Sequence, residues 1–221
     1  MKKGVQFPIF LLLFSQFAFA AAKSHVIAFG KWTSVKCVMN DRNEVADLKV
    51  RALFVDSRVK EFTVGVPHEV TDRIFVVRRA FRINDALPQD NGESVRWIWQ
   101  LGGWLMVDRV SGRVTQLNLP DFDLSSSNVA WFRDYAAYCG FSENGKNWFA
   151  IVVQMGRRKT VLKKTLGSAP DESGRAACST PEWQRQPVRV TFGPVNNQKF
   201  TYSIRGTVAN FLDDPEEEQA E

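Results

Sequence analysis

The sequence predicts an all-β protein, and three observations support this prediction. Apolar and polar residues alternate with a period of two over most of the chain, as they do along half-buried strands. No window of about a dozen residues carries an apolar helical stripe with capping residues at its ends. Short turn signals such as Ser111-Gly112 and Asn144-Gly145 separate the alternating segments. We therefore expect antiparallel hairpins throughout.

Eleven segments alternate strongly enough to be predicted as strands, and turn-favouring residues separate most of them. In chain order they are 48–55, 59–64, 73–83, 95–101, 104–110, 113–119, 129–141, 148–155, 160–164, 188–192 and 199–204. The predicted turns are Asp56-Ser57, Gly102-Gly103, Ser111-Gly112, Glu143-Asn144-Gly145, Gly156-Arg157 and Asn196-Asn197. Residues 148–153 are apolar on both faces of their strand, so both faces need cover. This predicts stacked sheets, arranged either as a β-sandwich or as blades.

A weak internal repeat favours blades. Residues 55–77 resemble residues 107–132 at an offset of about 50 residues, which is a spacing typical of propeller repeats. The segment 138–150 places a Ser-Glu-Asn-Gly-Lys turn before an apolar strand. In this it resembles the β-propeller blades of the WD-like and periplasmic type, although the chain lacks their Trp-Asp signature. The resemblance implies a partial or small β-propeller-like fold, and a β-sandwich is the alternative.

The first twenty residues have the three parts of a secretory signal peptide. Lys2 and Lys3 precede an apolar run over 5–14, and Ala18-Phe19-Ala20 forms the small-x-small site that signal peptidase cleaves. The run falls short of the roughly 20 apolar residues that span a bilayer. We expect cleavage after Ala20 and export to the periplasm or the exterior. The exported chain would be a single all-β domain over 21–212, with no transmembrane segment.

The charge is unevenly distributed along the exported chain. Residues 23–212 hold 27 basic and 18 acidic side chains, which gives +9, whereas residues 213–221 hold six acids. We predict that residues 213–221 form a disordered, solvated acidic tail. The alternative is that this tail screens a basic surface meant for an anionic partner.

The cysteine count permits one disulfide. An exported protein with Cys37, Cys139 and Cys178 can form one bridge and keep one free thiol. Cys139 and Cys178 are the nearest pair in the sequence, so we predict that they pair. The alternative is that Cys139 is a free core residue, because it alternates in step with the apolar residues of 131–141.

Catalytic motifs are weak. The two histidines, His25 and His68, stand in no recognised motif and offer no base beside a nucleophile, and no zinc-type spacing is present. Asp121 and Asp123 would lie on one side of an extended loop, where paired carboxylates can cleave glycosidic bonds. Turn chemistry is the favoured explanation for both, and it also explains Asp56 and Asp108 at corresponding positions of the repeat. We predict no cofactor.

The best candidate site is basic. Arg157, Arg158 and Lys159 are predicted at the tip of a hairpin, where they can meet phosphate, acidic polysaccharide or an anionic membrane face. Charged tips also deter aggregation of exposed strands. Other basic residues cluster at Arg78, Arg79, Arg82, Lys163 and Lys164. Trp97, Trp99 and Trp104 can form a stacking platform, but core packing explains them as well.

The sequence thus favours a non-enzymatic, exported binding or interaction module whose partner is a protein or an anionic envelope polymer. An exported chain without a recognised binding motif is not expected to bind nucleic acid. The alternative function is a secreted glycan hydrolase that uses Asp121 and Asp123.

Overall fold

A computed structural model describes residues 24–38, 45–84, 97–168, 178–195 and 198–212, which form fifteen strands. The predicted fold class is confirmed, because the strands form antiparallel hairpins in stacked sheets. The predicted signal peptide at 1–20 and the predicted tail at 213–221 lie outside the described residues. Within the described residues, no helix is long and apolar enough to cross a membrane.

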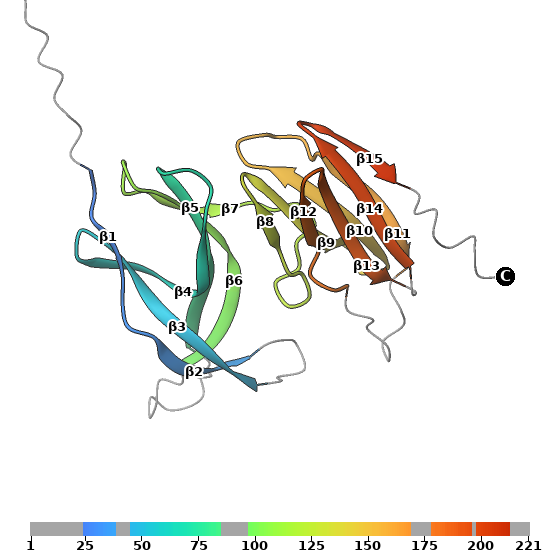
Figure 1. The fold of residues 1–221 in the computed structure, drawn as a ribbon. Helices are drawn as coiled ribbons and strands as arrows, with labels where there is room; N and C mark the ends of the chain where they lie inside the picture. The colour runs from blue at the N-terminus through green and yellow to red at the C-terminus, as the bar shows by residue number, and fades with distance from the viewer. Residues whose placement is uncertain (1–23, 39–44, 85–96, 169–177, 196–197, 213–221) are drawn as a thin grey trace, which may run out of the picture.

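The first half of the chain forms a closed barrel, seen on the left of Figure 1. Strands β2 to β6 follow one another as an antiparallel meander, and β2 then pairs with β6 in parallel through Cys37 and Trp99. A closed meander with an odd number of strands must contain one such parallel pair. β1 extends the ring beside β3, and β7 extends it beside β6. The strands are β1 (Ile27–Phe29), β2 (Thr33–Val38), β3 (Val45–Val55), β4 (Arg58–Glu69), β5 (Ile74–Asn84), β6 (Trp97–Asp108) and β7 (Val114–Leu117).

Side chains fill the barrel in two layers, as expected for a small barrel. One layer is centred on Leu53, Phe75 and Val107, which are all at most 1 % exposed. The other is centred on Val50, Val64 and Ala80, and Trp99 packs against it. The alternation along each strand therefore reports the inside and outside of the barrel.

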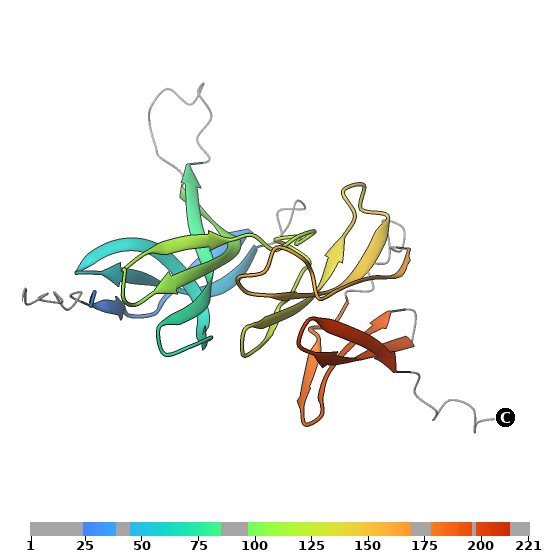
Figure 2. The same cartoon turned by 90° about the horizontal axis from the view of Figure 1, so that it is seen from above.

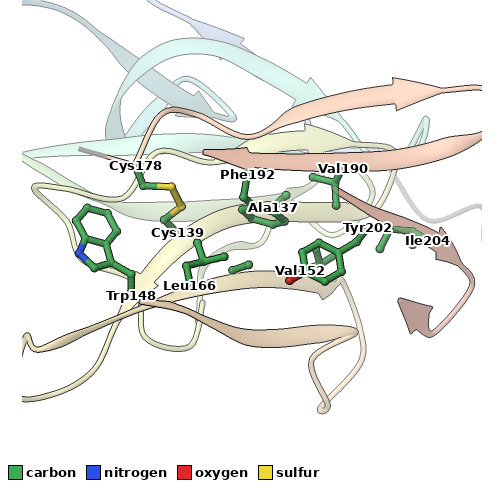
Figure 3. Packing of buried hydrophobic residues seen from close by; sticks show 11 residues of the cluster. Ala137, Cys139, Trp148, Val152, Leu166, Cys178, Val190, Phe192, Tyr202 and Ile204 are labelled. Carbon is green, nitrogen blue, oxygen red and sulfur yellow. A yellow bond between two sulfur atoms is a disulfide. The ribbon is translucent and has the colours of Figure 1, made fainter. Parts of the chain in front are cut away.

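The second half of the chain forms a sandwich of two four-stranded sheets, stacked one above the other in Figure 2. Figure 3 shows the core between them, with the Cys139–Cys178 disulfide beside Trp148. The first sheet has the order β11-β10-β9-β8 and the second the order β12-β13-β14-β15. The strands are β8 (Ala130–Phe132), β9 (Tyr135–Phe141), β10 (Asn147–Gln154), β11 (Leu162–Ser168), β12 (Glu182–Arg185), β13 (Val188–Val195), β14 (Gln198–Arg205) and β15 (Val208–Leu212).

The structure corrects several predicted strand boundaries. Gly102-Gly103 is no turn: β6 runs through it, opposite a bulge between Arg78 and Ala80. A Cβ at Gly102 would lie 3.0 Å from the Cβ of Arg79, so the glycine permits a close approach where the barrel strand bends. Residues 129–141 form two strands instead of one, because Arg133 adopts a φ of 52° and begins a tight turn. The prediction also missed β1, β2, β12 and β15.

The two copies of the predicted repeat lie in different parts of the fold. Residues 55–77 run from the end of β3 into β5, within the barrel, whereas residues 107–132 leave β6 and end in β8 of the sandwich. The second copy therefore contains the connection between the two halves. The sandwich alternative describes the second half of the chain, and a propeller-like ring is not confirmed.

Asp108 stabilises the barrel end as a charged group. Arg73 donates hydrogen bonds to both of its carboxylate oxygens, from Nε at 2.8 Å and from Nη2 at 2.5 Å. These bonds lower the pKa of Asp108 well below its usual range and outweigh the opposing effect of burial, and the backbone N–H groups of Val110 and Ser111 lower it further. Asp108 thus has the turn-stabilising role predicted for it.

This lowered pKa predicts an acid-dependent stability. Because the pKa is lower in the folded state, the contribution of Asp108 is fully present above the usual value of 3.8 and is lost as pH falls through the folded value. We expect Asp108→Asn to be less stable than the wild type at neutral pH, with a difference that shrinks steadily below about pH 4. Thermal unfolding followed by circular dichroism from about pH 7 to about pH 2 measures this. A difference that does not vary with pH would contradict it.

Candidate functional site

The predicted basic tip is an exposed loop between β10 and β11. The last paired residues before and after it are Val152 and Leu162. Arg157 N–H donates to the carbonyl of Gln154 at 3.2 Å, and Gly156 supplies the left-handed φ of 78° that this turn requires. Arg157, Arg158 and Lys159 are all exposed. The loop therefore holds three cations in solvent at one end of the sandwich.

Two pockets flank this basic loop. The first has a volume of about 430 Å³ and lies between the loop and Thr207, which belongs to the turn between β14 and β15. The second has a volume of about 350 Å³ and lies between the loop and the segment 117–120 that leaves the barrel. Arg157, Arg158 and Lys159 line both pockets. A ligand longer than either pocket can thus contact the same three cations from both sides of the loop.

Two buried or half-buried tyrosines fix the walls opposite the loop. Tyr135 donates its hydroxyl hydrogen to the carbonyl of Gly206 at 3.0 Å, beside Thr207. Tyr138, fully buried, donates to the carbonyl of Pro120 at 2.7 Å. Burial raises the pKa of Tyr138 far above its usual range, and the nearby charge of Asp121 raises it further, so the hydroxyl remains a donor. Both walls are therefore anchored to β9.

Electrostatics make the basic loop receptive to anions. Within the described residues, no carboxylate lies within ion-pair distance of Arg157, Arg158 or Lys159. The carboxylate of Asp134 is close to the base of the loop, but it accepts a hydrogen bond from Gln154 Nε2 at 2.8 Å. No His, Cys, Asp or Glu lines either pocket among the described residues. The described residues that line the two pockets offer positive charge and hydrogen-bond donors, and they include no carboxylate, imidazole or thiol.

Comparisons of this chain with protein-family models, with curated proteins and with solved structures found no significant match. The geometry of the chain itself therefore carries the functional argument.

The carboxylates considered for glycan cleavage both have partners within the chain. Asp121 forms an ion pair with Lys163 at 2.7 Å, and its carbonyl accepts a hydrogen bond from Phe141 N–H. Asp123 accepts hydrogen bonds from Ser125 and from the backbone N–H of Ser126. Burial raises the pKa of Asp123, but these hydrogen bonds together outweigh it and leave the pKa below its usual value. Asp123 is thus an anionic loop cap, which is a poor proton donor.

The histidines lie at separate places. His25 Nδ1 lies 2.6 Å from Asp56 Oδ2 at the start of the barrel. His68 stacks on Trp131 with ring centroids 5.7 Å apart, and its Nε2 lies 2.8 Å from the carbonyl oxygen of Arg133. His68 therefore links the barrel to the sandwich. Among the described residues, no group of three His, Cys, Asp or Glu side chains could hold a metal ion.

The three tryptophans form no common platform. Trp97 is half exposed and carries Arg82 over its ring at 4.9 Å, whereas Trp99 packs edge-on against Phe62 in the barrel. Trp104 lies at the junction of barrel and sandwich, 5.2 Å from the ring of Trp131. The core interpretation therefore holds for Trp99 and Trp104.

Three of the remaining basic residues have partners within the chain. Arg78 donates to the carbonyl of Leu124 at 2.6 Å, and Arg79 pairs with Glu61 at 2.9 Å. Lys163 is paired with Asp121. The loop cations Arg157, Arg158 and Lys159 line the two pockets described above.

The predicted disulfide is confirmed. Cys139 of β9 and Cys178, which precedes β12, are bonded with their Cα atoms 6.3 Å apart, and Cys37 is a buried free thiol. Burial raises the pKa of Cys37, so this thiol is unreactive. A disulfide in the sandwich core is consistent with an oxidising, exported location.

Sequence reasoning found the cations but missed the pocket walls. Thr207 lies some 50 residues from the loop in sequence, and residues 117–120 lie roughly 40 residues before it. Thr207 reaches the loop because the two sheets of the sandwich are stacked. Residues 117–120 reach it because the chain passes the loop as it leaves β7 of the barrel. No local pattern in the sequence could have indicated this.

Proposed function

We propose that the protein is an exported, non-enzymatic binding module that holds an anionic polymer of the cell envelope or its surroundings. The observation that carries the proposal is the loop of three exposed cations between two pockets. A single small anion would occupy one side of the loop, whereas a polymer chain can cross it and use both sides. The protein works in the periplasm or outside the cell.

Binding has better support than catalysis. The pockets present arginine, lysine, threonine and asparagine side chains, which donate hydrogen bonds to sulfate, phosphate or carboxylate groups. The hydrolase candidates Asp121 and Asp123 are engaged in an ion pair and a loop cap. An acidic protein is the alternative partner, since it carries the same charge without the repeated sugar units.

Charge reversal tests the proposal. We expect Arg157→Glu, Arg158→Glu and Lys159→Glu together to weaken binding to heparin, used as a polyanionic probe, by about 10- to 100-fold at low salt. Exposed ion pairs contribute roughly 0.2–1 kcal/mol each, and three lost contacts in the upper part of this range, at about 0.5–1 kcal/mol each, give an effect of this size. Isothermal titration calorimetry at several salt concentrations measures both the affinity and its salt dependence.

A charge-matched variant distinguishes the effect of the loop cations on binding from the effect of the overall net charge. Lys31, Lys49 and Lys60 are exposed on the barrel, and their reversal to Glu changes the net charge by the same amount. We expect this control to bind heparin almost as well as the wild type. Equal losses in the two variants would show that overall charge, and not the loop, governs binding. If the protein bound an acidic protein but no anionic polysaccharide, the proposal that its ligand is an anionic polymer would be wrong.

A further inference from the structure

Strand β15 is an open sheet edge without the usual protection. Within the described residues it pairs with β14 alone. Its residues, Val208–Leu212, include no charged side chain and no proline. Of the other outer strands of the sandwich, β11 carries Lys163 and Lys164 and β12 carries Glu182 and Arg185, whereas β8 is uncharged but only three residues long and half-buried. Charges on an edge and very short edge strands both deter pairing with another chain, so β15 is the edge of this sandwich that is suited to it.

The core face of β15 is only partly covered. Ala209 and Phe211 point to the same face because side chains alternate along a strand, and Ala209 packs against the sandwich core. The Phe211 ring lies 5.4 Å from the ring of the buried Tyr202, yet Phe211 is 50 % exposed. There is thus open space beside β15 on the core side, and an apolar residue from an added strand would fill it.

The backbone groups of β15 alternate in a way that fixes which residues can pair. Gly206 and Thr207 form a two-residue turn closed by the pair Arg205 and Val208. The closing pair of such a hairpin exchanges both of its hydrogen bonds. Val208, Asn210 and Leu212 therefore direct their N–H and C=O groups toward β14. Ala209 and Phe211 direct theirs toward the open edge.

We propose that a second copy of this chain adds its own β15 to this edge, antiparallel, about a two-fold axis at Asn210. In this register Ala209 lies opposite the second copy's Phe211, and both residues have free backbone groups to exchange. A small residue thus faces a large one on the core side, and Val208 faces the second copy's Leu212 on the other side. The β12-β13-β14-β15 sheet of one copy then continues into the same sheet of the other copy. The interface is self-complementary, as two-fold symmetry requires.

The charges at the ends of the strand favour a second copy over an unrelated peptide. The second copy's Leu212 would lie opposite Val208, the neighbour of Thr207 that lines the first basic pocket. In the sequence, Leu212 is followed directly by Asp213, Asp214 and the acids of 216–218. In the dimer, Leu212 of each copy, the last described residue before this acidic sequence, would therefore lie near the Arg157–Lys159 loop of the other. This attraction operates twice in the dimer, and it needs no external ligand.

Asn210 gives a sharp test because it would face its own symmetry mate. Asn210 is exposed, and across the new pair its position is not hydrogen-bonded, where side chains approach closely. Like charges directly opposite each other destabilise a strand pair, and opposite charges stabilise it. We expect the exported wild-type protein to sediment as a dimer. Asn210→Lys and Asn210→Glu should each weaken dimerisation by at least about 10-fold, and a mixture of the two variants should restore a heterodimer.

Analytical ultracentrifugation across a concentration series measures these states, with circular dichroism to show that each variant is folded. Thr33→Lys, at an exposed strand position of the barrel, is the control and should leave the dimer unchanged. A wild-type protein that sediments as a monomer at every concentration overturns the proposal. So does a dimer that tolerates both single charges, or two folded variants that fail to pair when mixed.

Discussion

Replacing Cys139 and Cys178 together by alanine is expected to lower the free energy of unfolding of the sandwich by about 4 kcal/mol. The two cysteines are 39 residues apart, and a cross-link that closes a loop of this length removes roughly that much conformational entropy from the unfolded chain. The bond also lies in the core, where Cys139 and Cys178 are 2 % and 3 % exposed. The alanine variant should therefore melt about 10 °C or more below the wild type.

Reductant supplies the control for this expectation. Thermal unfolding of the wild type should shift downward in a strong thiol reductant, whereas the double variant should not respond to it. Cys37→Ala tests the remaining thiol, which lies in the barrel at the closing pair of β2 and β6. It should leave the response to reductant intact. A double variant as stable as the wild type would mean that the cross-link contributes nothing to the sandwich.

The sequence predicted best those features that short segments determine. Asp56-Ser57 was predicted as a turn, and both residues adopt the left-handed φ values, 50° and 65°, that a tight hairpin requires. Asn144-Gly145 was predicted likewise, and Ser142 Oγ donates to Asn144 Oδ1 within that turn. In both places the turn residues themselves favour the required backbone conformation, so local reasoning was sufficient, although the Asp56 carboxylate also contacts the distant His25.

Features that depend on distant segments were predicted poorly. Gly102-Gly103 has the composition of a turn, but the nearby Arg79 side chain from another strand makes it a site of close approach inside β6. The turn at Arg133-Asp134 contains neither Gly nor Asn, so it went unrecognised. The parallel pairing of β2 with β6 closes the barrel across some 60 residues, and hydrophobic alternation gives no information about such partners.

In the candidate site, too, the locally determined part was predicted and the part that depends on distant segments was not. Arg157, Arg158 and Lys159 were found because three adjacent cations after a glycine are visible in the sequence. The pockets were not found, because their walls are held in place by residues distant in sequence. Tyr135 of β9 binds the carbonyl of Gly206 beside Thr207, and Tyr138 of β9 binds the carbonyl of Pro120. Binding sites of this kind need a rigid scaffold as well as exposed charge, and the scaffold is a property of the whole fold.

Replacing Phe75 by alanine is expected to cost the barrel about 3–5 kcal/mol and to leave most of the sandwich folded. Phe75 is 1 % exposed in the barrel core, its ring lies 5.9 Å from that of Phe29, and Arg109 lies over it at 4.7 Å. Removing a buried aromatic ring of this kind leaves a cavity that the closed ring of strands cannot easily collapse to fill.

Phe75→Ala should destabilise the barrel more than the sandwich because the two have separate hydrophobic cores. Phe75 and its neighbours belong to one cluster of buried residues, and the disulfide and Trp148 belong to another. The contacts between barrel and sandwich are fewer, and they centre on Trp104, Trp131 and the hydrogen bond that joins His68 to Arg133. Regions with separate cores open as separate cooperative units when the contacts between them are weaker than those within them.

Native-state hydrogen exchange distinguishes the outcomes. In Phe75→Ala, amides of β3 to β6 should exchange faster, whereas those of β9, β10, β13 and β14 should keep most of their protection. Phe192→Ala, at a fully buried position of the sandwich, is the matched variant and should give the opposite pattern. Equal loss of protection in both halves would mean that the Trp104–Trp131 junction makes barrel and sandwich a single cooperative unit. The basic loop belongs to the sandwich, and only one of its two pockets uses residues 117–120 at the end of the barrel, so with separate units Phe75→Ala should reduce heparin binding less than Phe192→Ala does.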